Sequence, residues 1–83
     1  MFPHVTAWRV NETYVQFTVQ GGADIQEVTF FEVFLNDKPV ADRLGPTIGS
    51  TLLIPTYTTG TVHVAVPAHF RDGSWERVID EER

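Results

Sequence analysis

Apolar side chains alternate with other residues along the segment 61–70, where every second position holds Val62, Val64, Val66 or Ala68. Successive side chains of a β-strand point to opposite faces, so this pattern predicts a strand with one buried face. Val15, Phe17 and Val19 repeat the pattern in the segment 13–20. A helix would need apolar residues every three or four positions instead.

Composition supports strands throughout the chain. Valine, isoleucine and threonine make up 25 of the 83 residues, whereas leucine and alanine, the usual material of helical bundles, number four and five. Glycine, asparagine, aspartate and proline separate the alternating segments. Together these features predict an all-β fold with strands over residues 5–10, 13–20, 28–35, 40–42, 50–54 and 61–70.

The C-terminal segment fits two interpretations. Trp75, Val78 and Ile79 have helical spacing behind a possible cap at Ser74, whereas Trp75, Arg77 and Ile79 would share one face of a strand. We favour a strand to about Ile79, because a sheet edge needs cover. The sequence therefore predicts a single β-sandwich domain over residues 1–79 and a frayed acidic tail over residues 80–83.

Two segments look like parts of fibronectin type III domains. Residues 31–41, Phe-Glu-Val-Phe-Leu-Asn-Asp-Lys-Pro-Val-Ala, resemble that family's third strand and following hairpin, and Val62-x-Val64-x-Val66-x-Ala68 resembles its penultimate strand. Asp72-Gly73-Ser74 stands where the family has the loop before its last strand. The resemblance implies an antiparallel Ig-like or fibronectin type III-like two-sheet sandwich of about six or seven strands.

The chain lacks two aromatic residues that are characteristic of that family. Phe17 stands where the family has a tryptophan in the second strand, and Val62 stands where it has a tyrosine. The family's tyrosine corner is therefore either missing or replaced by Tyr57. The resemblance is to a divergent member.

Charge and cysteine content exclude several functions. Eleven acidic against six basic residues give a net charge of −5, which offers no attraction for nucleic acid or anionic membranes. No cysteine is present, so disulfides, zinc ribbons and thiol nucleophiles are excluded. No signal peptide or transmembrane segment is apparent. We expect a cytoplasmic or particle-associated (virion) protein, although an excised module of a longer chain remains the alternative.

The residues that could support chemistry are few and scattered. His63 and His69 share one face of a strand but lie about 20 Å apart, and Asp72 or Glu76 would have to complete a metal site beside His69. Ser50 and Ser74 lie in no nucleophile motif. We therefore expect no metal, no cofactor and no enzymatic activity.

Two short motifs have plainer interpretations. Asn11-Glu12-Thr13 satisfies the glycosylation sequon and falls in a predicted turn, but without a secretion signal we interpret it as accidental. Arg71-Asp72-Gly73 permutes an integrin-binding tripeptide known from some fibronectin modules, so that function does not transfer. We interpret it as a tight turn.

A candidate binding surface follows from strand parity. If Phe31, Val33 and Leu35 enter the core, as the resemblance to fibronectin type III domains implies, their neighbours face outward, beside the outward residues of the segment 61–70. The predicted patch consists of Phe30, Glu32, Phe34, His63, Ala65 and Pro67. The alternative is that the C-terminal segment, with Trp75 or Ile79, packs over these side chains. Pro67 also predicts a bulge or an interrupted ladder, because proline has no backbone donor.

These features favour a non-catalytic binding or structural module that acts through protein–protein contacts or self-association. Small cysteine-free sandwiches of this kind are similar to accessory domains of phage particles, such as capsid decoration or tail proteins. A second hypothesis is a small acidic inhibitor or regulator that occupies a basic site on a host enzyme. A third is a carbohydrate-binding module that uses exposed aromatic residues such as Trp8, Phe34 or Trp75.

Overall fold

The computed structural model describes residues 4–22, 25–40, 42–57 and 59–83. The described residues form eight β-strands and one short 3₁₀ turn, η1 (Ile25–Glu27), with no α-helix among them. The strands are β1 (His4–Arg9), β2 (Tyr14–Gly21), β3 (Val28–Phe31), β4 (Phe34–Leu35), β5 (Lys38–Pro39), β6 (Thr51–Pro55), β7 (His63–Phe70) and β8 (Trp75–Glu82). These ranges contain no helix that is long and apolar enough to cross a membrane.

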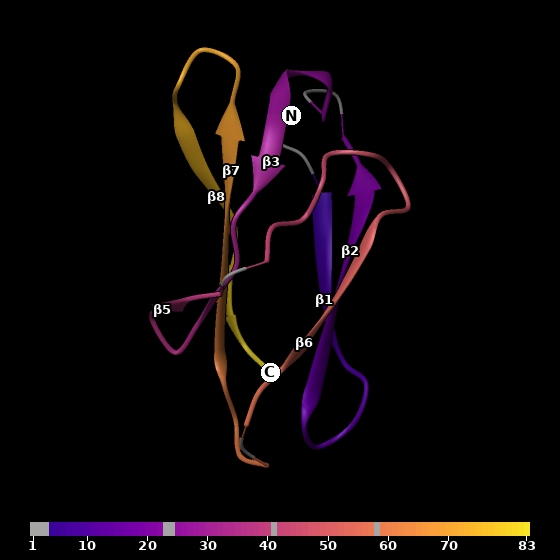
Figure 1. Ribbon diagram of the computed structural model, residues 1–83, viewed down its shortest axis with the longest axis vertical. Helices are drawn as coiled ribbons and strands as arrows, with labels where there is room; N and C mark the ends of the chain where they lie inside the picture. Colours follow the sequence, from indigo (N-terminus) through magenta and orange to yellow (C-terminus); the bar gives the residue numbers. More distant parts are fainter. Residues whose placement is uncertain (1–3, 23–24, 41, 58) are drawn as a thin grey trace.

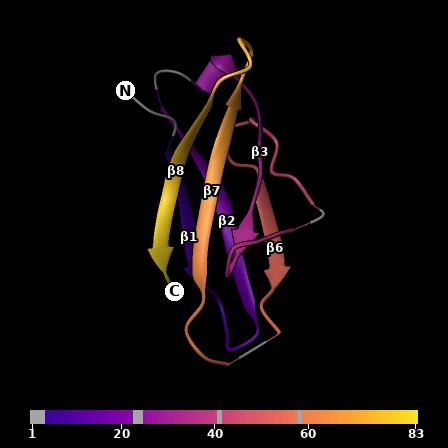
Figure 2. The same cartoon turned by 90° about the vertical axis from the view of Figure 1, so that its left-hand side faces the viewer.

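The strands form two antiparallel sheets that face each other (Figure 1). One sheet has three strands in the order β1-β2-β6. The other has five: β7 pairs with β8 on one side and with β3 and β4 on the other, and β5 pairs with β4. Figure 2 looks onto the outer face of the five-stranded sheet, with the three-stranded sheet behind it. The predicted all-β class is therefore confirmed, in the arrangement of a β-sandwich.

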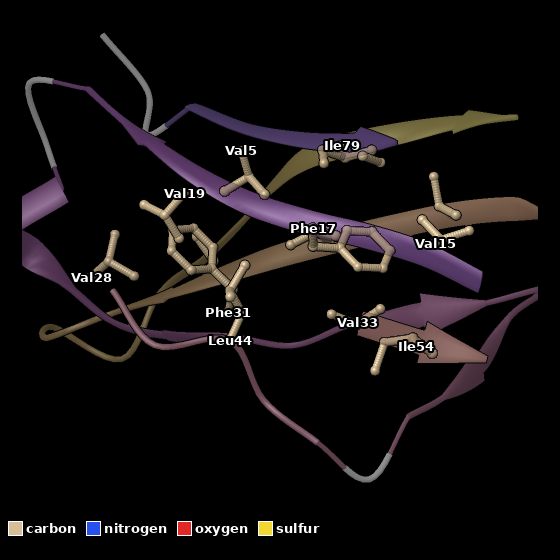
Figure 3. Packing of buried hydrophobic residues seen from close by; sticks show 14 of the residues in the cluster. Val5, Val15, Phe17, Val19, Val28, Phe31, Val33, Leu44, Ile54 and Ile79 are labelled. Carbon is tan, nitrogen blue, oxygen red and sulfur yellow. The ribbon is translucent and has the colours of Figure 1, made fainter. Parts of the chain in front are cut away.

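The core lies between the two sheets, and strand parity determines its members. Phe17 and Val64 are fully buried, as their alternating patterns predicted, and Val33 is fully buried, as the resemblance implied. Figure 3 shows Phe17 from β2 beside residues of the opposite sheet. The rest of the buried apolar cluster consists of Val5, Ala7, Val15, Val19, Val28, Phe31, Leu44, Ile54, Val62, Val66, Ala68 and Ile79.

Pro67 explains an interruption in the five-stranded sheet. The predicted strand over residues 28–35 is divided into β3 and β4, which pair with β7 in the same register on either side of Pro67. The backbone N–H of Glu32 donates to the carbonyl of Pro67 at 3.0 Å. Pro67 has no N–H to return that bond, so the ladder breaks at this point.

On its other side β7 pairs with β8, and the register of this pairing shifts beside Pro67. Val66 pairs with Ile79 and Pro67 pairs with Arg77, so Val78 is the extra residue of a bulge in β8. Both Val78 and Ile79 pack against the core. The predicted disturbance at Pro67 is confirmed on both of its sides.

The β4–β5 hairpin is tighter than predicted. Asn36 and Asp37 have φ values of 51° and 66°, the left-handed conformation of a two-residue hairpin turn. This turn pairs Leu35 with Lys38, so the strand is β5 rather than the predicted segment 40–42. Within that segment, Val40 donates one further backbone bond to Val33, and Ala41 lies outside the described residues.

The C-terminal segment is a strand, as favoured, but it extends beyond Ile79. β8 pairs with β7 as far as Glu82, and Arg83 exchanges two backbone hydrogen bonds with Val62. The expectation of a frayed tail over residues 80–83 was therefore wrong, because the ladder supplies partners for these backbone groups. Tyr57 does not replace the missing tyrosine corner, since it is 90% exposed.

Candidate functional site

All six residues of the predicted patch lie on the outer face of the five-stranded sheet. Their inward neighbours Phe31, Val33 and Val66 are fully buried, which leaves the alternate positions outside. The side chains of Phe30, Glu32, Phe34, His63 and Pro67 are partly exposed. Ala65 is only 6% exposed. We refer to these six residues as the outer-face patch.

The middle of the outer-face patch is apolar. Phe34 of β4 lies opposite Ala65 of β7, and Ala65 lies opposite Asp80 of β8. Glu32 lies two residues before Phe34, and its backbone N–H donates to the carbonyl of Pro67. Because Ala65 is small, no bulky side chain of β7 lies directly opposite the ring of Phe34. Phe34 is thus a candidate anchor for a partner.

One end of the patch contains an aromatic cluster of which the predicted patch included Phe30 alone. Phe30 stacks on His69, with ring centroids 4.9 Å apart. The ring of Trp75 meets both of them edge-on, at 5.6 Å from Phe30 and 4.7 Å from His69. The guanidinium of Arg43 lies 4.4 Å from the centre of the Phe30 ring, at cation–π distance. We refer to Phe30, His69, Trp75 and Arg43 as the aromatic cluster.

The C-terminal strand extends the outer-face patch and does not cover it. β8 lies beside β7 in the same sheet, so Trp75 joins the patch at its edge, whereas Ile79 points into the core. Of the alternative that Trp75 or Ile79 packs over the patch, only the edge-on contact of Trp75 with Phe30 is found, because Ile79 is buried in the core. Trp75 remains 49% exposed.

The other end of the patch is charged. Asp80 contacts His63 at 2.5 Å, between Oδ1 and Nε2, and accepts a hydrogen bond from Arg77 at 3.0 Å. The bond from Arg77, more than its charge or that of His63, lowers the pKa of Asp80 below its ordinary value. Glu82 lies 4.0 Å from His63. This end of the patch therefore presents carboxylates with one imidazole between them.

The histidines do not converge on a shared site. His63 and His69 stand at opposite ends of β7, one beside Glu82 and the other beside Trp75. Among the residues that the structure describes, no three histidine, aspartate or glutamate side chains are grouped to hold a metal ion.

Both short motifs occupy turns. Asp72 accepts hydrogen bonds from the backbone and hydroxyl of Ser74, and Gly73 has a φ of 88°. Asn11 accepts two hydrogen bonds from Thr13 in the exposed bend between β1 and β2.

Comparison with protein-family models, with curated proteins and with solved structures gives no match for this chain.

Proposed function

We propose that the protein is a non-catalytic binding module that docks a partner protein on the outer face of its five-stranded sheet. The observation that carries this proposal is the row of aromatic side chains on that face, from Phe34 through Phe30 to Trp75. Aromatic residues dominate the binding energy of protein interfaces. Their accumulation on the exposed face of an acidic protein favours docking over a purely solvated surface.

The charges around this row indicate the chemistry of the partner. Glu32, Glu82 and the Arg77-paired Asp80 border the apolar centre, with Arg43 on Phe30, and the chain as a whole carries a net charge of −5. The partner surface should therefore present apolar side chains with lysine or arginine around them. Interfaces with an apolar centre and a polar rim are the usual form of such contacts.

The order of the strands supports a divergent Ig-like or fibronectin type III-like assignment within this proposal. In Ig constant-type sandwiches the first, second, fourth and fifth strands form one sheet, while the third, sixth and seventh form the other. Here β1, β2 and β6 form one sheet, and β3 with β4, β7 and β8 belong to the other. The short strand β5 departs from that pattern, because it pairs with β4 in the second sheet. A role as an accessory protein of a virion, such as a capsid decoration or tail component, is the narrower form of the proposal and rests on analogy of fold.

A carbohydrate-binding module is the second candidate. The half-exposed Trp75, beside Phe30 and His69, favours it, because sugar rings stack on exposed aromatic faces. The third candidate, an acidic regulator of an enzyme, would bind that enzyme through the carboxylates that border the patch. In a capture experiment it would retain one enzyme, whereas a structural module would retain the components of an assembly.

The replacement Phe34→Ser tests the proposal. The matched control is Trp8→Ser, which removes an aromatic side chain that is 68% exposed from the other sheet. Each variant is compared with the parent protein for partner capture from the native host, for self-association by sedimentation, and for glycan binding on an array. We expect Phe34→Ser to weaken the protein contact by about tenfold or more, whereas Trp8→Ser leaves it unchanged.

Thermal denaturation of both variants shows whether each still folds. A folded Phe34→Ser variant with undiminished capture and self-association would rule out the outer-face patch as the docking surface. Glycan binding that is lost only in Trp75→Ser would favour the carbohydrate module. An unfolded Phe34→Ser variant would mean that the side chain belongs to the core, which also contradicts the proposal.

A further inference from the structure

The two open sides of the sandwich, where the edges of the sheets meet, are built differently. On the side of β1 and β8, Arg83 donates to the carbonyl of Ala7 at 3.0 Å, and Arg9 donates to the carbonyl of Arg83 at the same distance. These bonds join the two sheets. On the opposite side, β6 and the β4–β5 hairpin border a groove of about 500 Å³. Figure 2 shows β8 and β6 at opposite edges of the molecule.

The groove is largely apolar and spans both sheets. Leu35, Pro39 and Val40 line it from the five-stranded sheet, and Ile54, Pro55 and Tyr57 line it from the β6 side. Its charged lining residues, Lys38 and Asp42, have opposite signs. The groove thus suits apolar side chains and repels neither charge.

Beside this groove, the backbone of β6 has hydrogen-bonding groups that no other described strand uses. Val19 donates to Ser50, and Thr56 donates to Thr13, so alternate residues of β6 face β2. By this parity Leu52 and Ile54 point their backbone groups at β2, whereas Thr51 and Leu53 point theirs away from it. Within the described ranges, β6 pairs with β2 alone. Pro55 ends the strand and offers only a carbonyl.

We propose that this edge binds an extended peptide segment of a partner protein by strand addition. The guest backbone pairs with Thr51 and Leu53 and becomes a fourth strand of the β1-β2-β6 sheet. Alternate guest side chains then point between the sheets into the groove. A small molecule would use the groove but not the free edge, so the two features together favour a peptide.

The chemistry of the guest follows from the same features. Its inward side chains are apolar and its outward ones polar, and the net charge of −5 favours basic residues at its ends. This site lies on the edge of the other sheet, so it does not depend on the outer-face patch or on the proposed function.

The probe is a synthetic heptapeptide, Lys-Thr-Val-Thr-Val-Thr-Lys, with blocked ends. When the peptide adds antiparallel to β6 and its valines enter the groove, its threonine amides face β6. A second peptide carries methyl groups on those threonine amides, which removes the donors and blocks the approach. Binding to the full chain is followed by the backbone amide resonances of the protein. We expect shifts at Thr51, Leu53 and Val40 with the first peptide, and at least about tenfold weaker binding of the second.

Two replacements of Leu53 distinguish the contribution of its backbone N–H to binding from that of its side chain. Leu53→Pro removes an edge N–H that β2 does not use, whereas Leu53→Ala keeps it and removes only an outward side chain that is 53% exposed. We expect Leu53→Pro to weaken binding by about tenfold and Leu53→Ala to leave it nearly unchanged. If Leu53→Pro does not fold, the methylated peptide decides the question.

Three results would overturn the proposal. The first is equal binding of the two peptides, which would leave the edge backbone without a role. The second is the absence of shifts in β6 at up to about 1 mM peptide, a concentration that would detect even weak binding. The third is a dimer of the protein alone that Leu53→Pro dissociates, which would make a second copy of the chain the occupant.

Discussion

At the turn between β7 and β8, a single carboxylate organises the backbone. Asp72 accepts hydrogen bonds from the hydroxyl of Ser74 at 2.6 Å and from its backbone N–H at 2.9 Å. These two bonds, the hydroxyl first, hold the pKa of Asp72 below its ordinary value of 3.8. The ionised form therefore stabilises the folded state. That stabilisation is present above pH 3.8 and is lost as the pH falls through the lowered pKa.

Replacing Asp72 with alanine should make the turn less stable in a pH-dependent way. We expect the thermal midpoints of the parent and of Asp72→Ala to differ most near neutral pH and to converge below pH 3.8. Asp72→Asn keeps an acceptor oxygen without the charge, so its midpoint at neutral pH should lie between the other two. A difference that stays constant down to about pH 3 would mean that the charge of Asp72 contributes nothing.

At the scale of strands, the interruption at Pro67 has a testable origin. If the missing N–H causes the break between β3 and β4, Pro67→Val should restore a donor facing the carbonyl of Glu32. The new bond is worth about 0.5–1.5 kcal/mol, and the greater freedom of the unfolded chain offsets about 0.4–1 kcal/mol of it. We therefore expect little change in stability but slow hydrogen exchange at the new amide.

The control for this experiment is the amide of Glu32, which donates to the carbonyl of Pro67 in the parent protein. Its exchange should be slow in both proteins. Fast exchange at the new amide of the Pro67→Val variant, beside a protected Glu32, would show that the carbonyl of Glu32 is not positioned to accept. The break between β3 and β4 would then have another cause.

Strand parity could be predicted from the sequence wherever the alternation was long. The segments 13–20 and 61–70 alternate for eight residues or more, and their apolar positions are buried as expected. The alternation of the segment 28–35 is less clean, because Phe30 and Phe31 are adjacent, and the outward placement of Phe30 and Phe34 came from the resemblance to fibronectin type III domains. The hairpin was misplaced because its register depends on two left-handed residues, Asn36 and Asp37, and no alternation marks that choice.

Two parts of the binding surfaces could not be predicted from local patterns. Arg43 reaches Phe30 from an irregular segment that only the folded chain brings near β3. The groove beside β6 depends on how the β4–β5 hairpin sits against the other sheet. Trp75 could have been included, because the predicted last strand already placed it at one edge of the same sheet.

At the scale of the whole molecule, the hydrogen bonds of Arg9 and Arg83 join the two sheets at one open side of the sandwich. Arg9 donates to the carbonyls of Gly60 and Arg83, at 2.9 and 3.0 Å, so it connects β1 to two distant parts of the chain. Arg9→Leu should lower the free energy of unfolding by about 1–3 kcal/mol, because hydrogen bonds to a charged group are lost.

Urea denaturation measures this change, with Arg77→Leu as the control. Arg77 belongs to an exposed pair with Asp80, and such pairs contribute little to stability. Equal effects of the two replacements would show that Arg9 behaves as an ordinary surface cation and does not connect the sheets.

The pairing of distant strands also determines when the protein can fold. Phe17 pairs with Leu52, and Phe31 pairs with Ala68, so each sheet joins residues from the two halves of the chain. During synthesis the first half can form only the local β1–β2 and β4–β5 hairpins, and β3 has no strand to pair with until β7 emerges. Such topologies fold in milliseconds to seconds, because long loops must close before their contacts form. The nascent chain therefore passes through a period in which its future core is accessible to chaperones, proteases and other unfinished chains.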